Sequence, residues 1–225
     1  MPFGERIGSI MARRRTNSRT TLTTVIIALV LLALYQLLDS NGLLSDNSPL
    51  QADTQGGFVE VHFIDVGQGD SIYIKTPTQD ILIDAGERGD TVVDYLKSLN
   101  VDELELVIGT HPHSDHIGGL DTVIDSFKVG KVLLPRVSHT TKTFEDVLLA
   151  IKDSGLKVTT PKVGDEYLLG DGTWTILAPN SEDYDNLNNY SIIIRLDFHG
   201  HSFLFTGDAE VLSEEEMLQN SLPLK

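Results

Sequence analysis

The chain has 225 residues, of which 40% are hydrophobic, and it carries a formal net charge of −16 at pH 7. It contains no cysteine, which excludes a disulfide framework and a lipid-modified cysteine, and leaves His, Asp and Glu as side chains for holding a metal. The charge is uneven: five arginines and one glutamate give residues 1–20 a net +4, which leaves −20 on the remainder. Such an acidic body disfavours nucleic-acid binding, unless bound divalent ions reverse the field at the site.

The N-terminal segment predicts a membrane anchor. Residues 1–21 are rich in Arg and Thr and are expected to form a disordered cytoplasmic tail. Residues 22–38 are 17 uncharged and mostly apolar residues, which predicts one transmembrane helix. The arginines before it place that side in the cytoplasm, so we expect a single-pass protein of the cell membrane with an extracellular body. A cleaved signal peptide is the alternative, but residues 35–40 offer no small-residue cleavage site.

After this segment the sequence alternates between strand and helix patterns. Residues 39–57 are rich in Ser, Asn, Asp and Gly and are interpreted as a linker, so that residues 58–225 make up the domain. Alternating or continuous apolar runs predict strands at 59–64, 71–75, 81–84, 104–109, 131–134, 166–169, 174–177, 191–196 and 202–205, with another from Val158. The first three are expected to form an antiparallel meander. Helical spacing predicts helices at 92–99, 120–127 and 144–151, and another that begins at Glu214. This pattern predicts a mixed α and β domain.

A cluster of potential metal ligands follows the predicted strand 104–109. Residues 110–116 read T-H-P-H-S-D-H and place His111, His113, Asp115 and His116 within six residues. Imidazole and carboxylate groups are the usual protein ligands of zinc when cysteine is absent. We expect His111 and His113 to share one ion, and Asp115 and His116 to hold a second. Two ions roughly 3.5–4 Å apart can polarise an ester or a phosphodiester.

These residues carry a resemblance to a known family. The H-x-H-x-D-H motif, with Ile83-Asp84-Ala85-Gly86 before it and Thr206-Gly207-Asp208 after it, resembles the metallo-β-lactamase superfamily. The stretch D-V-G-Q-G-D-S at 65–71 resembles more narrowly the extracellular hydrolase domain of ComEC-type DNA-uptake proteins. The resemblance covers about residues 58–217. It implies an α/β (α+β) fold, the four-layer αβ/βα sandwich of the superfamily.

The resemblance also implies a binuclear site. Its two divalent ions would be zinc, with manganese as the alternative metal, and the residue that matches Asp208 bridges them in the superfamily. The implied ligands are His111, His113, Asp115, His116 and Asp208, and Asp115 is also implied as the catalytic residue that positions a metal-bridging hydroxide. Five further residues are expected to support the ligands or to contact substrate: Asp84, Gln68, Asp70, Asn189 and Ser191.

Two departures from the family pattern affect this expectation. Residues 188–191 read N-N-Y-S, where most members of the superfamily have another metal-binding His. Members also have a last His beyond the T-G-D motif, after a helix and a strand, and residues 209–225 contain no His. We therefore expect a domain that lacks the last strand and helix of the fold, as a fragment or as a shortened protein.

The predicted function is that of a membrane-anchored extracellular metal-dependent hydrolase, a phosphodiesterase or nuclease similar to ComEC. Its substrate would be DNA or a phosphate-containing surface polymer, and its membrane contact would be the N-terminal helix. Two alternatives stay open. One is a different hydrolase of the same fold, acting on a lactam, thioester or lactone. The other is a non-enzymatic accessory or binding protein of DNA uptake with a degenerate site, which the missing His favours.

Overall fold

The computed structural model describes residues 57–220 together with Leu222 and Leu224. The predicted tail and transmembrane helix, and the predicted linker up to residue 56, lie outside the described residues. Among the helices of the described part, none is both long and apolar enough to cross a membrane. The membrane anchor therefore stays a prediction from the sequence.

The first sheet begins with the expected meander. Strands β1 (Glu60–Phe63), β2 (Ile72–Lys75) and β3 (Asp80–Ile83) pair antiparallel in chain order, which confirms that prediction. The sheet then continues with parallel pairs through β5 (Leu106–Ile108), β7 (Val132–Leu133) and β8 (Val158–Thr159). Parallel neighbours need a crossover connection, and helices in the connections supply it. The result is a mixed six-stranded sheet in the order β1-β2-β3-β5-β7-β8.

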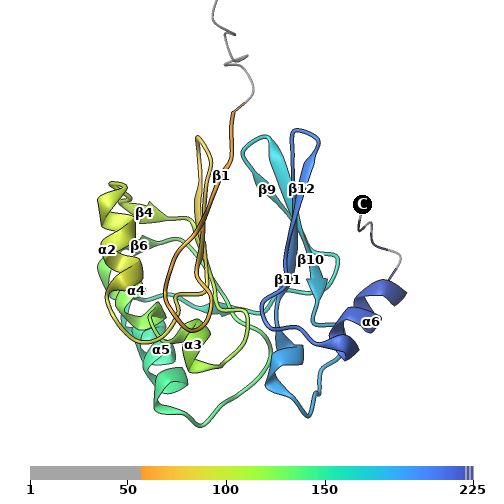
Figure 1. Cartoon of the computed structure of the whole chain (residues 1–225). Helices are drawn as coiled ribbons and strands as arrows, with labels where there is room; N and C mark the ends of the chain where they lie inside the picture. Colours follow the sequence, from red (N-terminus) through yellow and green to blue (C-terminus); the bar gives the residue numbers. More distant parts are fainter. Residues whose placement is uncertain (1–56, 221, 223, 225) are drawn as a thin grey trace, which may run out of the picture. The chain divides into compact units, whose positions relative to one another are not determined.

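Three amphipathic helices cover one face of this sheet (Figure 1): α2 (Thr91–Ser98), α4 (Leu120–Ser126) and α5 (Lys142–Asp153). Helix α5 starts at the cap residue Thr141, whose hydroxyl accepts a hydrogen bond from the backbone N–H of Phe144 at 3.4 Å. It buries Phe144, Val147 and Ile151, which recur at helical spacing. Each such side chain contributes about 1.5–3 kcal/mol when it leaves water, so these helices are held by one apolar face each.

The second sheet is antiparallel, with the order β12-β11-β10-β9. Its strands are β9 (Glu166–Leu169), β10 (Gly172–Ala178), β11 (Ile193–Phe198) and β12 (His201–Phe205). Trp174 and Ile176 point toward the first sheet and share a core with residues of β3 and β5. On the outer face, Met217 of helix α6 (Val211–Gln219) packs against Leu177 and Ile193. The layers therefore run helices, sheet, sheet, helix.

Several short elements differ from the expectation. The predicted strand 104–109 is interrupted at Glu105, which leaves β4 (Glu103–Leu104) to pair with β6 (Lys128–Val129) in a separate two-stranded sheet. The predicted metal loop contains a helical turn, α3 (Ser114–Ile117), and a 3-10 turn, η1 (Leu187–Tyr190), precedes β11. Elements of two to four residues are too short for apolar periodicity to reveal them. Helix α6 begins three residues earlier than predicted, at Val211.

The two sheets meet near the carboxyl ends of β3 and β5. Because these strands are parallel neighbours, the residues that follow them, Asp84 and Thr110, emerge at the same edge. The backbone N–H of Ile192, just before β11, donates to the carbonyl oxygen of Thr110 at 3.0 Å. This bond brings the second sheet to the same edge, and Asp208 follows the end of β12 there.

Candidate metal centre

Asp84 organises the histidine loop from beneath. Its carboxylate is fully buried and accepts three hydrogen bonds: from the backbone N–H of Thr110 at 2.7 Å, from the Thr110 hydroxyl at 2.6 Å and from Nδ1 of His116 at 2.8 Å. Its backbone is left-handed, with φ of 56°, a conformation that Asp tolerates better than most residues. The next backbone N–H, of Ala85, donates to the carbonyl oxygen of His116 at 2.7 Å. One carboxylate thus orients both ends of the motif.

The same contacts decide which nitrogen each histidine offers to a ligand. The Thr110 hydroxyl donates its hydrogen to the Asp84 carboxylate. Its oxygen lies 3.1 Å from Nδ1 of His111 and therefore accepts a hydrogen bond from that nitrogen. His116 likewise directs its Nδ1 proton to Asp84. Nε2 of each ring is therefore left as the ligand atom, and in the metal-free chain Nε2 of His111 lies 3.0 Å from Nδ1 of His113. A hydrogen bond from the other ring nitrogen is the usual support of a metal-binding histidine.

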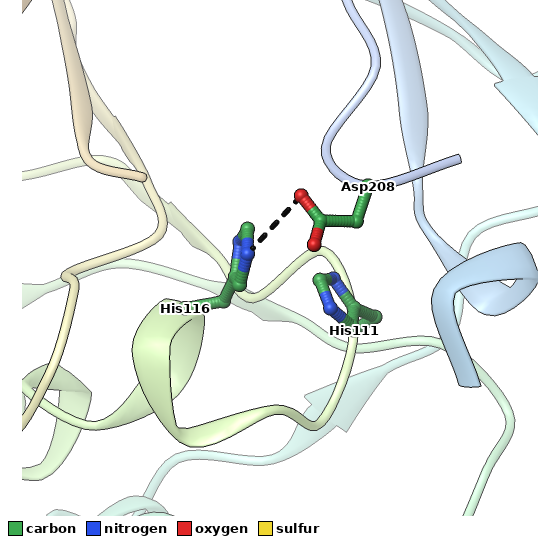
Figure 2. A group of neighbouring side chains, drawn as sticks. All are labelled: His111, His116 and Asp208. Carbon is green, nitrogen blue, oxygen red and sulfur yellow. Dashed lines mark ion pairs between the residues drawn. The ribbon is translucent and has the colours of Figure 1, made fainter. Parts of the chain in front are cut away.

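Asp208 completes a three-residue cluster with these two histidines. Figure 2 shows His111 and His116 from the loop facing Asp208 from beyond β12. One ligand atom from each of the three residues lies within 4.8 Å of the others, and His116 Nε2 is 3.3 Å from Asp208 Oδ1. Gly207 permits this approach, because it has a φ of 50° and a β-carbon there would lie 3.0 Å from the Thr110 hydroxyl.

The electrostatics of the two histidines differ. Burial, together with the positive charges of His116 and His113, lowers the pKa of His111 to about 3, so that its ring is neutral. Burial acts in the same sense on His116, but the hydrogen bond and charge of Asp84 outweigh it and raise the pKa of His116 to about 9. Without a metal, His116 is thus a cation held between Asp84 and Asp208. A bound divalent cation would take the place of the proton on Nε2.

Asp115 is fixed by the glycine turn that precedes β2. Its carboxylate accepts a hydrogen bond from the Gln68 amide at 3.1 Å. Burial opposes ionisation, but this hydrogen bond and the neighbouring histidines hold the pKa of Asp115 below its usual value. Gly69 packs on the Asp115 backbone so closely that a β-carbon would lie 1.7 Å from the carbonyl oxygen. The turn therefore forms one wall of the site.

The remaining predicted residues surround this group. His111 lies between the other two imidazoles, with its ring centroid 4.7 Å from His113 and 4.1 Å from His116. His113 and Asp115 are not in the three-residue cluster of the described chain, so the expected division of ligands between two ions stays a prediction. Desolvation raises the pKa of Asp70; the charge of His116 opposes the shift, and the charges of three nearby carboxylates, on Asp84, Asp208 and Asp115, add to it.

Asn189 and Ser191 lie in the stretch where most members of the superfamily have a further histidine. Both are buried, and the Ser191 hydroxyl is 3.4 Å from His111 Nδ1. The Asn189 side-chain oxygen accepts a hydrogen bond from the backbone N–H of Glu210 at 3.3 Å, so it anchors the chain just after Asp208. Ser191 therefore supports a histidine, and Asn189 supports the carboxylate segment.

Sequence reasoning missed Thr110 and Glu210. The Thr110 hydroxyl is hydrogen-bonded to both Asp84 and His111 and so links them. Its position directly before the first histidine was the available signal. The Glu210 carboxylate accepts hydrogen bonds from the side-chain amides of Asn186 at 2.8 Å and Asn188 at 3.1 Å, which ties η1 to the segment after Asp208. A Glu next to the T-G-D motif gives no signal of this contact.

The donor set fits a divalent metal ion. It combines a neutral imidazole, an imidazole whose second nitrogen is already hydrogen-bonded to a carboxylate, and an aspartate that is partly open to solvent. Nitrogen and carboxylate donors of this kind suit zinc, manganese or iron. Within the described part of the chain, the geometry provides one convergent group of three, with Asp115 and His113 beside it.

The comparisons with known proteins agree with this fold. The profile of the Metallo-beta-lactamase superfamily matches residues 64–220. The chain belongs to this superfamily, a family of metal-dependent hydrolases, and its relatives include ComEC-like proteins.

Three individual proteins are similar to the chain in sequence. The chain is 29% identical to ComE operon protein 3 of Bacillus subtilis over 71% of this chain and 23% of that protein. It is 26% identical to Recombination protein 2 of Haemophilus influenzae, over 69% of this chain and 19% of that protein. A shorter match, 37% identical over 54 residues, is to the exodeoxyribonuclease WalJ of Streptococcus pneumoniae and covers 23% of this chain and 20% of that protein. The chain thus spans about a fifth to a quarter of the length of these relatives.

We predict that Gly69→Ala is much more harmful than Gly67→Ala. Both glycines are left-handed, with φ of 93° and 78°, so both substitutions incur a backbone penalty of about 1 kcal/mol. A β-carbon at Gly67 meets nothing within 4 Å, whereas at Gly69 it collides with the Asp115 backbone. Chemical denaturation should show an additional loss of about 2 kcal/mol or more for Gly69→Ala. Equal losses would contradict the role of the turn as a wall of the site.

We also predict that Asp84→Asn weakens both the fold and the metal centre. An amide group in place of one carboxylate oxygen would point a donor at Thr110 or at His116, which are themselves donors. The expected cost is about 2–3 kcal/mol of unfolding free energy, with metal affinity lower by about 10–100-fold. Denaturation and competition with a metal chelator measure the two effects. The same substitution at exposed Asp171 is the control and should change neither.

Proposed function

We propose that this protein is a membrane-anchored, outward-facing phosphodiesterase that acts on nucleic acid. The observation that carries the proposal is the convergence of His111, His116 and Asp208 between the two sheets. A relative that matches the chain locally is named an exodeoxyribonuclease, which supports nucleic acid over a lactam or thioester substrate.

Each residue of the site has a definite task in this proposal. His111, His116 and Asp208 would form the centre of the metal site, and His113 and Asp115 would supply the further ligands beside them. A divalent ion there supplies Lewis acidity, which stabilises negative charge on a phosphate and makes water acidic enough to ionise near neutral pH. Asp84 keeps the two imidazoles oriented before substrate arrives, and Gln68 does the same for the Asp115 carboxylate.

The charge of the chain gives the metal a second task. At a net charge of −16, the protein repels a polyanion at long range. Close to the metal centre, the carboxylates of Asp70, Asp115 and Asp208 contribute to this repulsion of a polyanion. Bound cations would reverse the sign locally, so we expect substrate binding itself to depend on the metal, in addition to the chemical step.

The test is metal content and hydrolysis by the purified full-length chain. Elemental analysis should find bound divalent metal, and the loaded protein should cleave bis(p-nitrophenyl) phosphate and a single-stranded oligodeoxynucleotide. Asp208→Ala should lose metal and lower kcat/KM by about 100-fold or more, because the substitution removes a carboxylate that would bind the metal directly. Asp171→Ala, at an exposed turn, should leave both unchanged.

Other results would point elsewhere. Bound metal with cleavage of a lactam, thioester or lactone, and none of a phosphodiester, would move the protein to another hydrolase class of the same fold. A chain without bound metal and without hydrolysis would leave an accessory or binding role.

The anchored topology has its own test. If residues 22–38 cross the bilayer, the chain should resist alkaline extraction from membranes, and protease added outside intact cells should digest the domain. Replacing Leu29 and Leu31 by Arg should release the chain from the membrane, since each central Arg costs about 2.5–3.5 kcal/mol. Recovery of the unchanged chain in the soluble fraction would refute the anchor.

A further inference from the structure

A hollow lies between the two sheets, at the end opposite the histidines. Gln79 and Ile81 line it from the start of β3, and Asp84 follows the other end of that strand. Leu106, the first residue of β5, and Lys131, directly before β7, lie on the same wall. The cavity has a volume of about 210 Å³. Tyr167 and Trp174 line it from the second sheet, and Glu105 lies at its edge with Leu106.

The inner part of the hollow is apolar. Ile81, Leu106 and Trp174 are buried there, and a narrower apolar gap between the sheets continues inward from Ile81 and Trp174. The Tyr167 ring is stacked on Trp174, with centroids 4.2 Å apart and planes 12° apart. The two stacked rings make one aromatic wall opposite an aliphatic one. Such a space suits a single planar ring system.

The hollow is also lined by two polar groups, an amide oxygen and an ammonium group, that form no hydrogen bond or ion pair with a described residue. The side-chain oxygen of Gln79 is buried and has no hydrogen-bond partner in the part of the chain that the structure describes. A buried acceptor without a donor is unfavourable, and a bound donor would satisfy it. The Lys131 ammonium group lies 5.5 Å from the Tyr167 ring centroid and forms no ion pair with another described residue. Glu105, in contrast, accepts a hydrogen bond from the Asp80 backbone at 2.6 Å.

We propose that this hollow binds a small planar heteroaromatic compound that carries an N–H donor and an anionic group. The ring would lie between the aromatic wall and Ile81 and Leu106, its N–H would donate to Gln79, and its anion would pair with Lys131. Nucleotides share this chemistry with small heteroaromatic acids. The site is separate from the metal centre, so it does not depend on the proposed hydrolase function.

The experiment uses the full-length chain without metal and in the presence of a chelator, so that a phosphate group cannot bind an ion in the other site. Trp174 is the single tryptophan of the sequence, and its fluorescence reports directly on the hollow. Two probes are titrated: adenosine 5′-monophosphate for the nucleotide class and pyrrole-2-carboxylate for the small acids. A saturable change with either probe is expected, and the probe that binds identifies the class.

Variants decide whether the response comes from the proposed contacts. Lys131→Ala, at an exposed side chain, and Gln79→Leu should each weaken the affinity by about tenfold or more, as loss of a charged or buried hydrogen bond does. Lys128→Ala removes a nearby lysine that pairs with Glu103 outside the hollow, and it should bind like the unchanged protein. No saturable response to either probe, or equal affinity in Lys131→Ala, would overturn the proposal.

Discussion

The buried carboxylate of Asp84 is the contact on which the site depends. It stands at the end of a central strand and satisfies three donors of the histidine motif. Because it orients His116 directly and His111 through the Thr110 hydroxyl, both imidazoles are fixed before any ion arrives. Burying a charge is unfavourable unless it is paired, and the cationic form of His116 supplies that pairing in the metal-free protein.

The second half of the domain adds the groups that the motif itself lacks. Asp208 enters from beyond β12, and Ser191 approaches His111 from just before β11. Their position relies on the packing between the two sheets, in which Ile176 and Trp174 meet residues of β3 and β5. The Asn189 and Glu210 contacts then hold the two segments of the second half together near the site. Packing far from the metal centre therefore controls its geometry.

The sequence predicted the elements with strong periodicity and missed those that depend on pairing. Strands β9 to β12 and helix α5 carry regular apolar spacing and were found. The parallel continuation of the first sheet was not predicted, since a single sequence does not tell which strands become neighbours. Within the site, the histidines were found from their spacing. The close approach of His111 to His116 arises from helix α3, which turns the chain between His113 and His116 and is too short to be predicted.

The two-sheet construction has a consequence for the order of folding. His111 and Ser191 are 80 residues apart in sequence, and the inner faces of the sheets are covered only when both are present. During synthesis the first half emerges with all three histidines of the motif, before Asp208 exists to complete their cluster. Contacts between residues so far apart in sequence form late. The chain must first lose the entropy of the loop between them, and only then do the contacts stabilise the fold. The chain would therefore reach its full metal affinity only at the end of folding. The time course of metal uptake during refolding would report when the two halves dock.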